Sequence, residues 1–329
     1  MKNKLGSFLA CTALVILSGG CAPETAEEIA TKENIIVWEE IVENPGLTEE
    51  FELIFMADNH ISLCDERDAS LQEKANSRYE SFRSKDGDGA EESFQALMKY
   101  TKAEQPELLI LGGDVVDSAM WESIDFVKKE LENADIPWIY EMGNHDFEYG
   151  EEYYTETAYS EYLPRFADIS ESAQGYQIKE YEEFVVFAVD DDCNRITEKA
   201  LESFKAVIRH GKPIVLITHV PIEPHGDAAM DTMPKGEESK GLWEESNRVW
   251  GAAESGNSRV LLGENSCVPN ETTAEFLALV VDEDSPVELV LAGHIHFYHR
   301  DYLSGELVQV VTGAGFEKEL VKVTLVPGA

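Results

Sequence analysis

A short apolar segment that ends at glycine, aspartate, asparagine or histidine recurs along this chain, and it limits the fold more than any other feature. Five such segments occur in the 329 residues, at 51–57, 108–111, 136–140, 214–217 and 287–292. Apolar runs of this length, bounded by turn-forming residues, are typical of buried β-strands. Each predicted strand therefore delivers polar side chains at its carboxyl end.

Between these strands, apolar residues recur at helical spacing. The stripes are Phe94, Leu97 and Met98; Ile124, Val127 and Leu131; and Leu201, Phe204, Val207 and Ile208. Thr197 is a suitable N-cap for the last of these helices, and Gly211 is a suitable end. Strands that alternate with helices predict βαβ units and an α/β fold. Residues 308–311 and 321–326 add further β-structure.

In open α/β sheets, ligands bind outside the carboxyl ends of the strands, so we expect the five polar clusters to converge on one site. Asp58 and His60 are two residues apart on a segment expected to be extended, so both can point to the same side. Asp114 follows two glycines, which permit a tight turn before its carboxylate. Carboxylate and imidazole together suit a divalent metal.

The clusters contain enough ligands for two metal ions. The candidate ligands are Asp58, His60, Asp114, Asn144, His219, His294 and His296. With one bridging carboxylate, this set can hold two divalent ions about 3.5–4 Å apart, an arrangement that activates water for an in-line displacement. Mixed oxygen and nitrogen donors are compatible with Mn, Fe or Zn.

The order of the clusters resembles a known family. The blocks DNH, GGDVVD, GNHD, a lone His and GHIH follow one another from Asp58 to His296. This order resembles the calcineurin-like metallophosphoesterases, whose signature is DxH, GDxxD, GNH[DE], H and GHxH. The resemblance implies an α/β fold in which two packed mixed β-sheets are flanked by helices, a four-layer sandwich.

Position by position, the resemblance also implies residue roles. Asp58, His60 and His296 are expected to bind the first metal, Asn144, His219 and His294 the second, and Asp114 both. His145 is expected to protonate the leaving group or to stabilise the transition state, with Asp117 orienting it. A hydroxide that bridges the two metals would attack phosphorus.

The substrate remains open between a phosphomonoester and a phosphodiester, such as a nucleotide, a phospholipid headgroup or a cell-wall precursor. Ser118 stands where family members that act on protein serine and threonine usually carry arginine, which disfavours that class. Arg67, Arg78 and Arg83 follow the DNH block, and the sequence singles out none of them as a phosphate ligand. The alternative is a non-catalytic metal- or anion-binding surface lipoprotein, which would have no use for His145 and Asp117.

The charge of the chain restricts its partners. The sequence has 65 acidic and 26 basic side chains and a net charge of -39. Such a surface repels polyanions, so no nucleic acid partner is expected. A small phosphate ester is still accessible, because two bound metals reverse the field locally.

The N-terminus predicts export. Lys2 and Lys4 precede an apolar run and then LSGGC, so residues 1–20 resemble a signal peptide. Cys21 resembles the lipidated cysteine of bacterial lipoproteins, which would place the protein on the outer side of the cytoplasmic membrane; plain secretion is the alternative. Residues 21–33 are expected to form a flexible spacer, and residues 34–329 the catalytic domain, with a cap insertion at about 220–286.

Overall fold

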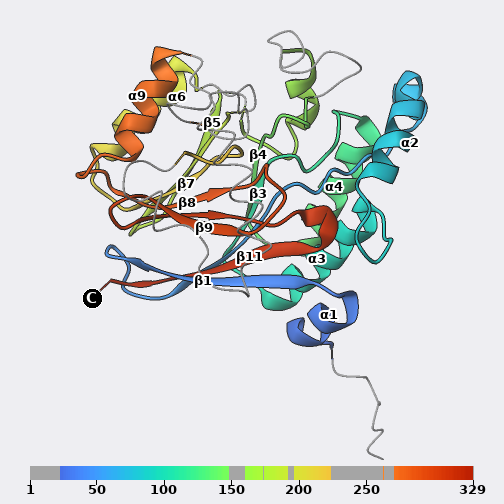
Figure 1. Cartoon of the computed structure of the whole chain (residues 1–329), viewed down its shortest axis with the longest axis horizontal. Coiled ribbons are helices and arrows are strands. Elements are labelled where there is room, and N and C mark those ends of the chain that lie inside the picture. Colours follow the sequence, from blue (N-terminus) through green and yellow to red (C-terminus); the bar gives the residue numbers. More distant parts are fainter. Residues whose placement is uncertain are drawn as a thin grey trace, which may run out of the picture.

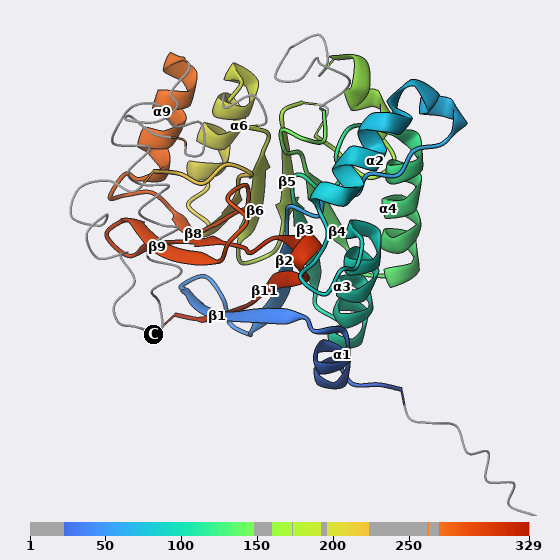
Figure 2. The same cartoon turned by 45° about the vertical axis from the view of Figure 1, so that its right-hand side comes forward.

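The computed structural model describes residues 23–147, 160–172, 174–191, 196–223, 262 and 270–328. In this part of the chain, two mixed β-sheets pack face to face, and helices cover the outer face of each (Figures 1 and 2). The prediction of a four-layer α/β sandwich is therefore confirmed.

The two sheets share a pattern of central parallel strands. The first has the order β1 (Ile36–Asn44), β11 (Glu319–Pro327), β2 (Phe51–Met56), β3 (Leu108–Gly112) and β4 (Trp138–Glu141). The second has the order β5 (Tyr176–Glu180), β6 (Val185–Val189), β7 (Ile214–Ile217), β8 (Val287–Ala292), β10 (Leu307–Val311) and β9 (His299–Ser304). β2, β3 and β4 are parallel, as are β6, β7, β8 and β10. Each parallel group therefore presents its carboxyl ends at one edge of its sheet.

Alternation along the strands divides the core into layers. In β2, Leu53 and Phe55 point between the sheets, where they join a cluster that includes Leu289 of β8. Ile54 and Met56 point the other way, towards the helices that cover the first sheet. Because successive side chains of a strand lie on opposite faces, both faces of each sheet need apolar residues.

The helices complete the outer layers. α1 (Ala26–Glu33), α3 (Ala90–Glu104) and α4 (Trp121–Ala134) contribute to the core of the first sheet. α6 (Glu198–Ile208) and α9 (Glu271–Val280) pack on the second sheet. The short 3₁₀ helices are η1 (Glu66–Leu71), η2 (Leu163–Phe166) and η4 (Gly315–Glu317), and α2 (Gln72–Ser81) continues from η1.

The structure confirms the five predicted strands, with small shifts at their ends. β7 and β8 have the predicted bounds. β4 begins at Trp138 rather than at residue 136, because Pro137 has no N–H to donate to the sheet. The sequence patterns did not predict the edge strands β1, β5 and β9, nor β6.

The prediction of a flexible spacer over residues 21–33 is wrong for its described part. Residues 26–33 form α1, which begins with a capping box between Thr25 and Glu28. Ile29 is 3% exposed and packs with Ala26 into the core of the first sheet. Two buried side chains and a capped first turn are enough to order this short acidic segment.

The predicted cap insertion must also be shortened. Residues 270–286 were included in it, but they contain α9, whose Phe276, Leu277 and Val280 are buried against the second sheet. Most of the remainder, 224–261 and 263–269, lies outside the described residues, as do residues 1–22 with the predicted signal peptide and Cys21. None of the described helices is long and apolar enough to cross a membrane.

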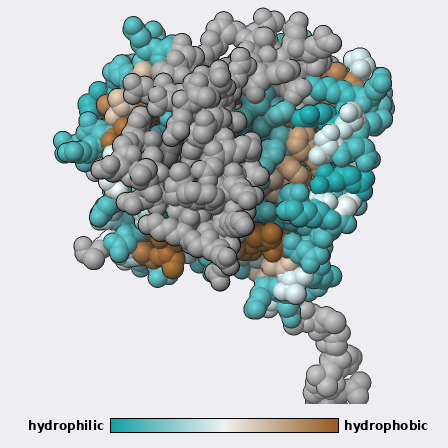
Figure 3. All heavy atoms as spheres, in the orientation of Figure 1, coloured by the Kyte–Doolittle hydropathy of each residue, from teal (hydrophilic) through white to brown (hydrophobic). Residues whose placement is uncertain are grey.

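Where Figure 3 shows described residues, the surface is largely hydrophilic, with small separate hydrophobic patches. The large apolar side chains exposed in the described part of the chain are Ile36 and Ile41, both in β1. Scattered apolar residues of this kind are ordinary on a folded protein.

Candidate metal centre

The loops that follow the central strands of both sheets meet at one place. Asp58 N donates to Gly113 O (3.0 Å), which joins the loops after β2 and β3. Gly293 N donates to His219 O (2.9 Å), which joins the loops after β7 and β8. His294 N donates to Asp58 Oδ2 (2.9 Å) and connects the two sheets. The polar clusters therefore converge as the sequence predicted.

The backbone at this place is unusual. Asp58, His60, Asp114, His294 and His296 have φ angles of 55°, 52°, 52°, 72° and 60°. The extended segment expected at Asp58 and His60 is therefore wrong, since both are left-handed. Non-glycine residues adopt this conformation infrequently, and such residues concentrate at functional sites.

One group of donors comes from the loops after β2 and β8. The ligand atoms of Asp58, His60 and His296 all lie within 4.8 Å of one another. His60 Nε2 is 3.1 Å from His296 Nε2, and His296 Nε2 is 3.4 Å from Asp58 Oδ1. Burial raises the pKa of the Asp58 carboxyl, but the nearby His296 imidazole lowers it by more than burial raises it. The pKa of Asp58 therefore lies below its ordinary value. These are the three residues expected at the first metal.

A second group of donors comes from the loops after β3, β7 and β8. The ligand atoms of Asp114, His219 and His294 also lie within 4.8 Å of one another. His219 Nε2 is 3.1 Å from Asp114 Oδ2 and 3.3 Å from His294 Nδ1. His219 Nδ1 lies 2.9 Å from Gly112 O, to which it can donate, so that Nε2 points to the centre of the site.

The charges in this second group are strongly coupled. Burial lowers the pKa of His219, but the Asp114 carboxylate raises it to about 10. Burial and the neighbouring His219 lower the pKa of His294 to about 4. A proton on His219 and a metal ion compete for the same nitrogen, so this group is built to hold positive charge.

Asp114 lies between the two groups. Its Oδ2 is 3.1 Å from His219 Nε2 and 4.0 Å from His60 Nε2, and its Oδ1 accepts from His145 N (2.7 Å). Burial raises the pKa of Asp114, but His219 and His145 hold it well below its ordinary value. An ionised carboxylate in this position is suited to bridge two cations.

Asn144 supplies the remaining expected donor. Its Oδ1 is buried and has no hydrogen-bond partner within the described part of the chain. A buried amide oxygen without a partner is costly unless a ligand or ion satisfies it. Two carboxylates, four imidazoles and this amide oxygen match a divalent metal that accepts oxygen and nitrogen ligands, so the residues fit the expected ions.

Two glycines of the motifs permit this close packing. A Cβ on Gly143 would lie 2.3 Å from Asp114 Oδ1. Gly113 has a φ of +93°, and a Cβ there would lie 2.5 Å from His219 Nδ1. The sequence suggested that glycine permits a tight turn before Asp114. The structure adds a second reason, because the loops touch at these glycines and leave no room for a side chain.

His145 and Asp117 form a pair beside the metal ligands. His145 Nδ1 is 3.0 Å from Asp117 Oδ1. Arg78 of α2 approaches the same carboxylate with Nε (2.5 Å) and Nη2 (3.1 Å). Burial raises the pKa of Asp117, but the neighbouring His145, His60 and Arg78 side chains hold it below its ordinary value.

Two buried aspartates support the loops of the site, and of these only Asp191 was missed in the sequence. Asp146 accepts from the backbone N–H groups of Asp114, Gly143 and Val116 and from the Tyr140 hydroxyl. Asp191 accepts from His219 N and Val220 N at 3.1 Å each. A signal for Asp191 was present, because the apolar run of β6 ends at three consecutive aspartates.

Two aromatic rings line the group that contains His60. Phe82 is stacked on His60, with ring centroids 3.8 Å apart and planes at 4°. Phe316 of η4 contacts His296 edge-on at 5.4 Å. Rings packed in this way fix the orientation of both imidazoles.

The fold and the site define a class of protein: an α/β sandwich with candidate metal ligands on the loops where two sheets meet. The model of the calcineurin-like phosphoesterase family matches residues 51–298, and the chain belongs to this family. It is therefore a metal-dependent phosphoesterase.

Comparisons with solved structures give distant likenesses. A dimetal phosphatase from Danio rerio is 12% identical, with 83% of this chain and 91% of that chain covered and a TM-score of 0.48. The protein TT1561 of Thermus thermophilus is 15% identical, with 81% and 91% covered and a TM-score of 0.41. The calcineurin-like phosphoesterase YfkN from Bacillus subtilis is 12% identical, with 82% of each chain covered and a TM-score of 0.40. A search of the curated proteins found no match.

Proposed function

We propose that this protein hydrolyses a phosphate ester at two divalent metal ions, outside the cytoplasmic membrane. The observation that carries the proposal is the pair of donor groups, Asp58, His60 and His296 beside Asp114, His219 and His294, with the His145–Asp117 pair next to them. The substrate would be a small phosphate ester.

The residues divide into three roles. Asp58, His60 and His296 would hold one ion, and Asn144, His219 and His294 the other, with Asp114 shared. Bound divalent ions at such a site polarise a phosphoryl group and activate water at neutral pH. His145 would donate a proton to the leaving oxygen, and its partial exposure, 27%, leaves it accessible to a substrate.

Asp117 suits this role of His145. The carboxylate lies against Nδ1 of the imidazole at 3.0 Å and is fully buried. It therefore keeps Nδ1 protonated, directs Nε2 away from itself and stabilises the imidazolium that a general acid needs. A protein that only bound metal or an anion would not need this pair.

The decisive test is Asp114→Asn, assayed with Mn²⁺ on one generic phosphomonoester and one generic phosphodiester. Loss of the shared negative charge should reduce kcat/KM by at least about 100-fold on the accepted ester. Metal content should fall from two ions per chain, measured by elemental analysis. Unchanged turnover in the variant would refute the shared role of Asp114, and a wild-type protein that holds metal but cleaves neither ester would support the binding lipoprotein instead.

The location is proposed from the N-terminal sequence. The LSGGC segment supports lipid attachment at Cys21, and diacyl chains suffice to hold a protein at a membrane. The full chain expressed in a bacterial host should sediment with membranes, whereas Cys21→Ala should not. Equal distribution of the two proteins in the soluble fraction would favour plain secretion.

A further inference from the structure

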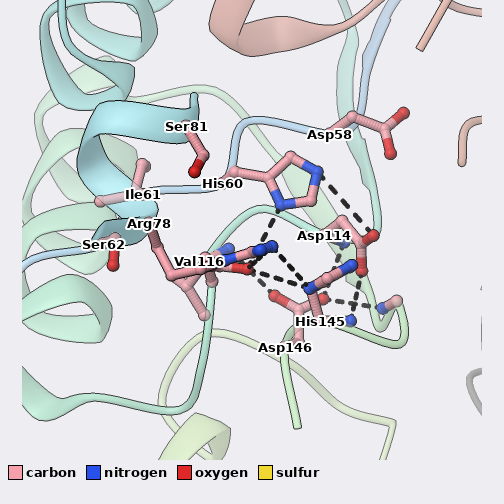
Figure 4. A network of polar contacts seen from close by, with 12 residues as sticks. Asp58, His60, Ile61, Ser62, Arg78, Ser81, Asp114, Val116, His145 and Asp146 are labelled. Atoms are coloured by element: carbon pink, nitrogen blue, oxygen red, sulfur yellow. Dashed lines mark hydrogen bonds and ion pairs between the residues drawn. The ribbon is translucent and has the colours of Figure 1, made fainter. Parts of the chain in front are cut away.

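Among the residues that the structure describes, Arg78 is a positively charged side chain that reaches the candidate site from outside the motif blocks. Arg78 is separated from Asp117 by 39 positions, yet its Nε and Nη2 contact both oxygens of that carboxylate. Its Nη2 also lies 3.3 Å from His145 Nδ1 (Figure 4). The guanidinium thus lies beside the pair that would act on the leaving oxygen.

The other two arginines that follow the DNH block lie elsewhere. Arg67 is held by Asp65 and Asp125, and Arg83 contacts Gly87 O and Glu80. The structure therefore distinguishes Arg78 from its neighbours, which the sequence could not do.

Arg78 is restrained in this position. Its guanidinium lies over the ring of Phe82, with Cζ 4.6 Å from the ring centroid, and Phe82 is itself stacked on His60. Such cation–π contacts restrict a long side chain. Arg78 is consequently oriented before any ligand arrives, which reduces the entropy lost on binding.

Arg78 lies on the accessible side of the site. Its side chain is 26% exposed, close to the 27% of His145 and the 34% of His296, while Asp58, His60 and Asp117 are fully buried. A ligand that contacts His145 therefore lies close to the guanidinium.

We propose that Arg78 binds the phosphoryl group of the substrate and makes the enzyme selective for phosphomonoesters over phosphodiesters. A monoester is largely dianionic above pH 7 and carries three terminal oxygens, whereas a diester is monoanionic and carries two. A guanidinium can donate charge-assisted hydrogen bonds to such oxygens, and the second negative charge strengthens the contact. This inference rests on the proposed hydrolysis of a phosphate ester.

The test compares Arg78→Gln with the wild type on p-nitrophenyl phosphate and bis-p-nitrophenyl phosphate in the presence of Mn²⁺. The loss of a charged hydrogen bond predicts a reduction in kcat/KM of about 10- to 100-fold on the monoester and below about 3-fold on the diester. Arg78→Lys keeps the charge without the planar fork, and should retain a preference for the monoester. Arg83→Gln is the matched control and should behave as the wild type on both esters.

Equal losses on both esters in Arg78→Gln would show that Arg78 acts only by holding Asp117 and His145, and would overturn the proposal. A wild-type preference for the diester, or no loss in the variant, would do the same. Thermal unfolding of each variant separates these outcomes from misfolding.

A binding measurement separates this inference from the proposed function. Calorimetry with Mn²⁺ at about pH 8 should show that the wild type binds inorganic phosphate, a dianion, more tightly than dimethyl phosphate, a monoanion, and that Arg78→Gln removes the difference. If the protein showed this difference in binding but hydrolysed no ester, the preference of Arg78 for dianionic phosphate would stand and the proposed hydrolysis would be rejected. If the protein hydrolysed an ester but bound both phosphates equally, the proposed hydrolysis would stand and the role of Arg78 in selecting dianionic phosphate would be rejected.

Discussion

Gly143 is the residue whose lack of a side chain matters most directly to the site. Gly143→Ala would place a Cβ 2.3 Å from Asp114 Oδ1, so either the carboxylate or the loop must move. We expect kcat/KM to fall at least about 10-fold and the free energy of unfolding to fall by about 1–3 kcal/mol. Steady-state kinetics and urea unfolding give the two quantities.

Gly87→Ala is a control for this substitution. Unlike Gly143, Gly87 has a positive φ, +91°, but a Cβ there meets nothing within 4 Å. It should lower stability by about 1 kcal/mol and leave kcat/KM unchanged. If Gly143→Ala also left activity unchanged, the close contact with Asp114 would have no role in positioning it.

Glu141 is a buried carboxyl residue outside the ligand groups. Burial, together with Asp190, raises its pKa well above the ordinary value of 4.5. The folded state therefore retains a proton that the unfolded state has lost, and stability should fall as the pH rises above 4.5. Glu141→Gln removes this titration and keeps an oxygen that accepts from Met142 N and the Ser172 hydroxyl, while its amide NH2 replaces the oxygen that accepts from Gln177 Nε2.

The expected result for Glu141→Gln is a stability gain over the wild type that is small near pH 4.5 and grows towards pH 8. Urea unfolding at several pH values measures it. A constant difference between the two proteins over this range would mean that Glu141 has the same pKa in both states.

At the scale of elements, α1 tests whether the residues before β1 belong to the domain. Ile29→Ala removes a side chain that is 3% exposed and should lower the free energy of unfolding by about 2–4 kcal/mol. Glu27→Ala, at an exposed position of the same helix, should change it by less than about 0.5 kcal/mol. Equal effects of the two substitutions in chemical denaturation would mean that this segment does not pack on the domain and is a spacer.

The elements also show why the sequence predicted some features and not others. β7 and β8 are central parallel strands that are apolar on both faces, so a continuous apolar run marks them clearly. β1 alternates exposed and buried residues and includes three glutamates, which resembles a polar surface segment. Within α2 only Ala75 is buried, so the sequence has no apolar stripe at helical spacing that would predict this helix.

The candidate site was likewise predictable from the sequence only in part. The seven expected ligands could be identified because each follows a strong strand signal or a motif, and the structure gathers six of them in two donor groups. The metal-binding roles of all seven stay predictions. The contact of Arg78 with Asp117 depends on how α2 docks, which no local pattern encodes. Left-handed backbone at Asp58 and His60 was equally invisible, because tertiary contacts hold both residues in a conformation that their own preferences disfavour.

At the scale of the whole molecule, the site connects the two sheets. Asp58 and Asp114 come from the first sheet, and His219 and His294 from the second. Bound metal should therefore stabilise the packing of the sheets, and removal by EDTA should leave buried carboxylates in mutual repulsion. We expect Tm to fall by about 5–10 °C and to recover with Mn²⁺.

Differential scanning fluorimetry with and without EDTA measures this shift. Asp114→Asn, with one charge fewer between the donor groups, should show a smaller shift than the wild type. An identical Tm for the wild type in both conditions would mean that metal does not contribute to the association of the sheets.

The docking of α1 shortens the distance over which a membrane anchor could act. Under the proposed lipidation, the Thr25 cap lies four positions after Cys21, so the tether between them reaches about 14 Å at full extension. β1 then begins beside η4, where Ile36 N donates to Lys318 O, close to the turn whose Phe316 touches His296. A tether this short would hold the catalytic edge near the bilayer surface, within reach of substrates embedded there.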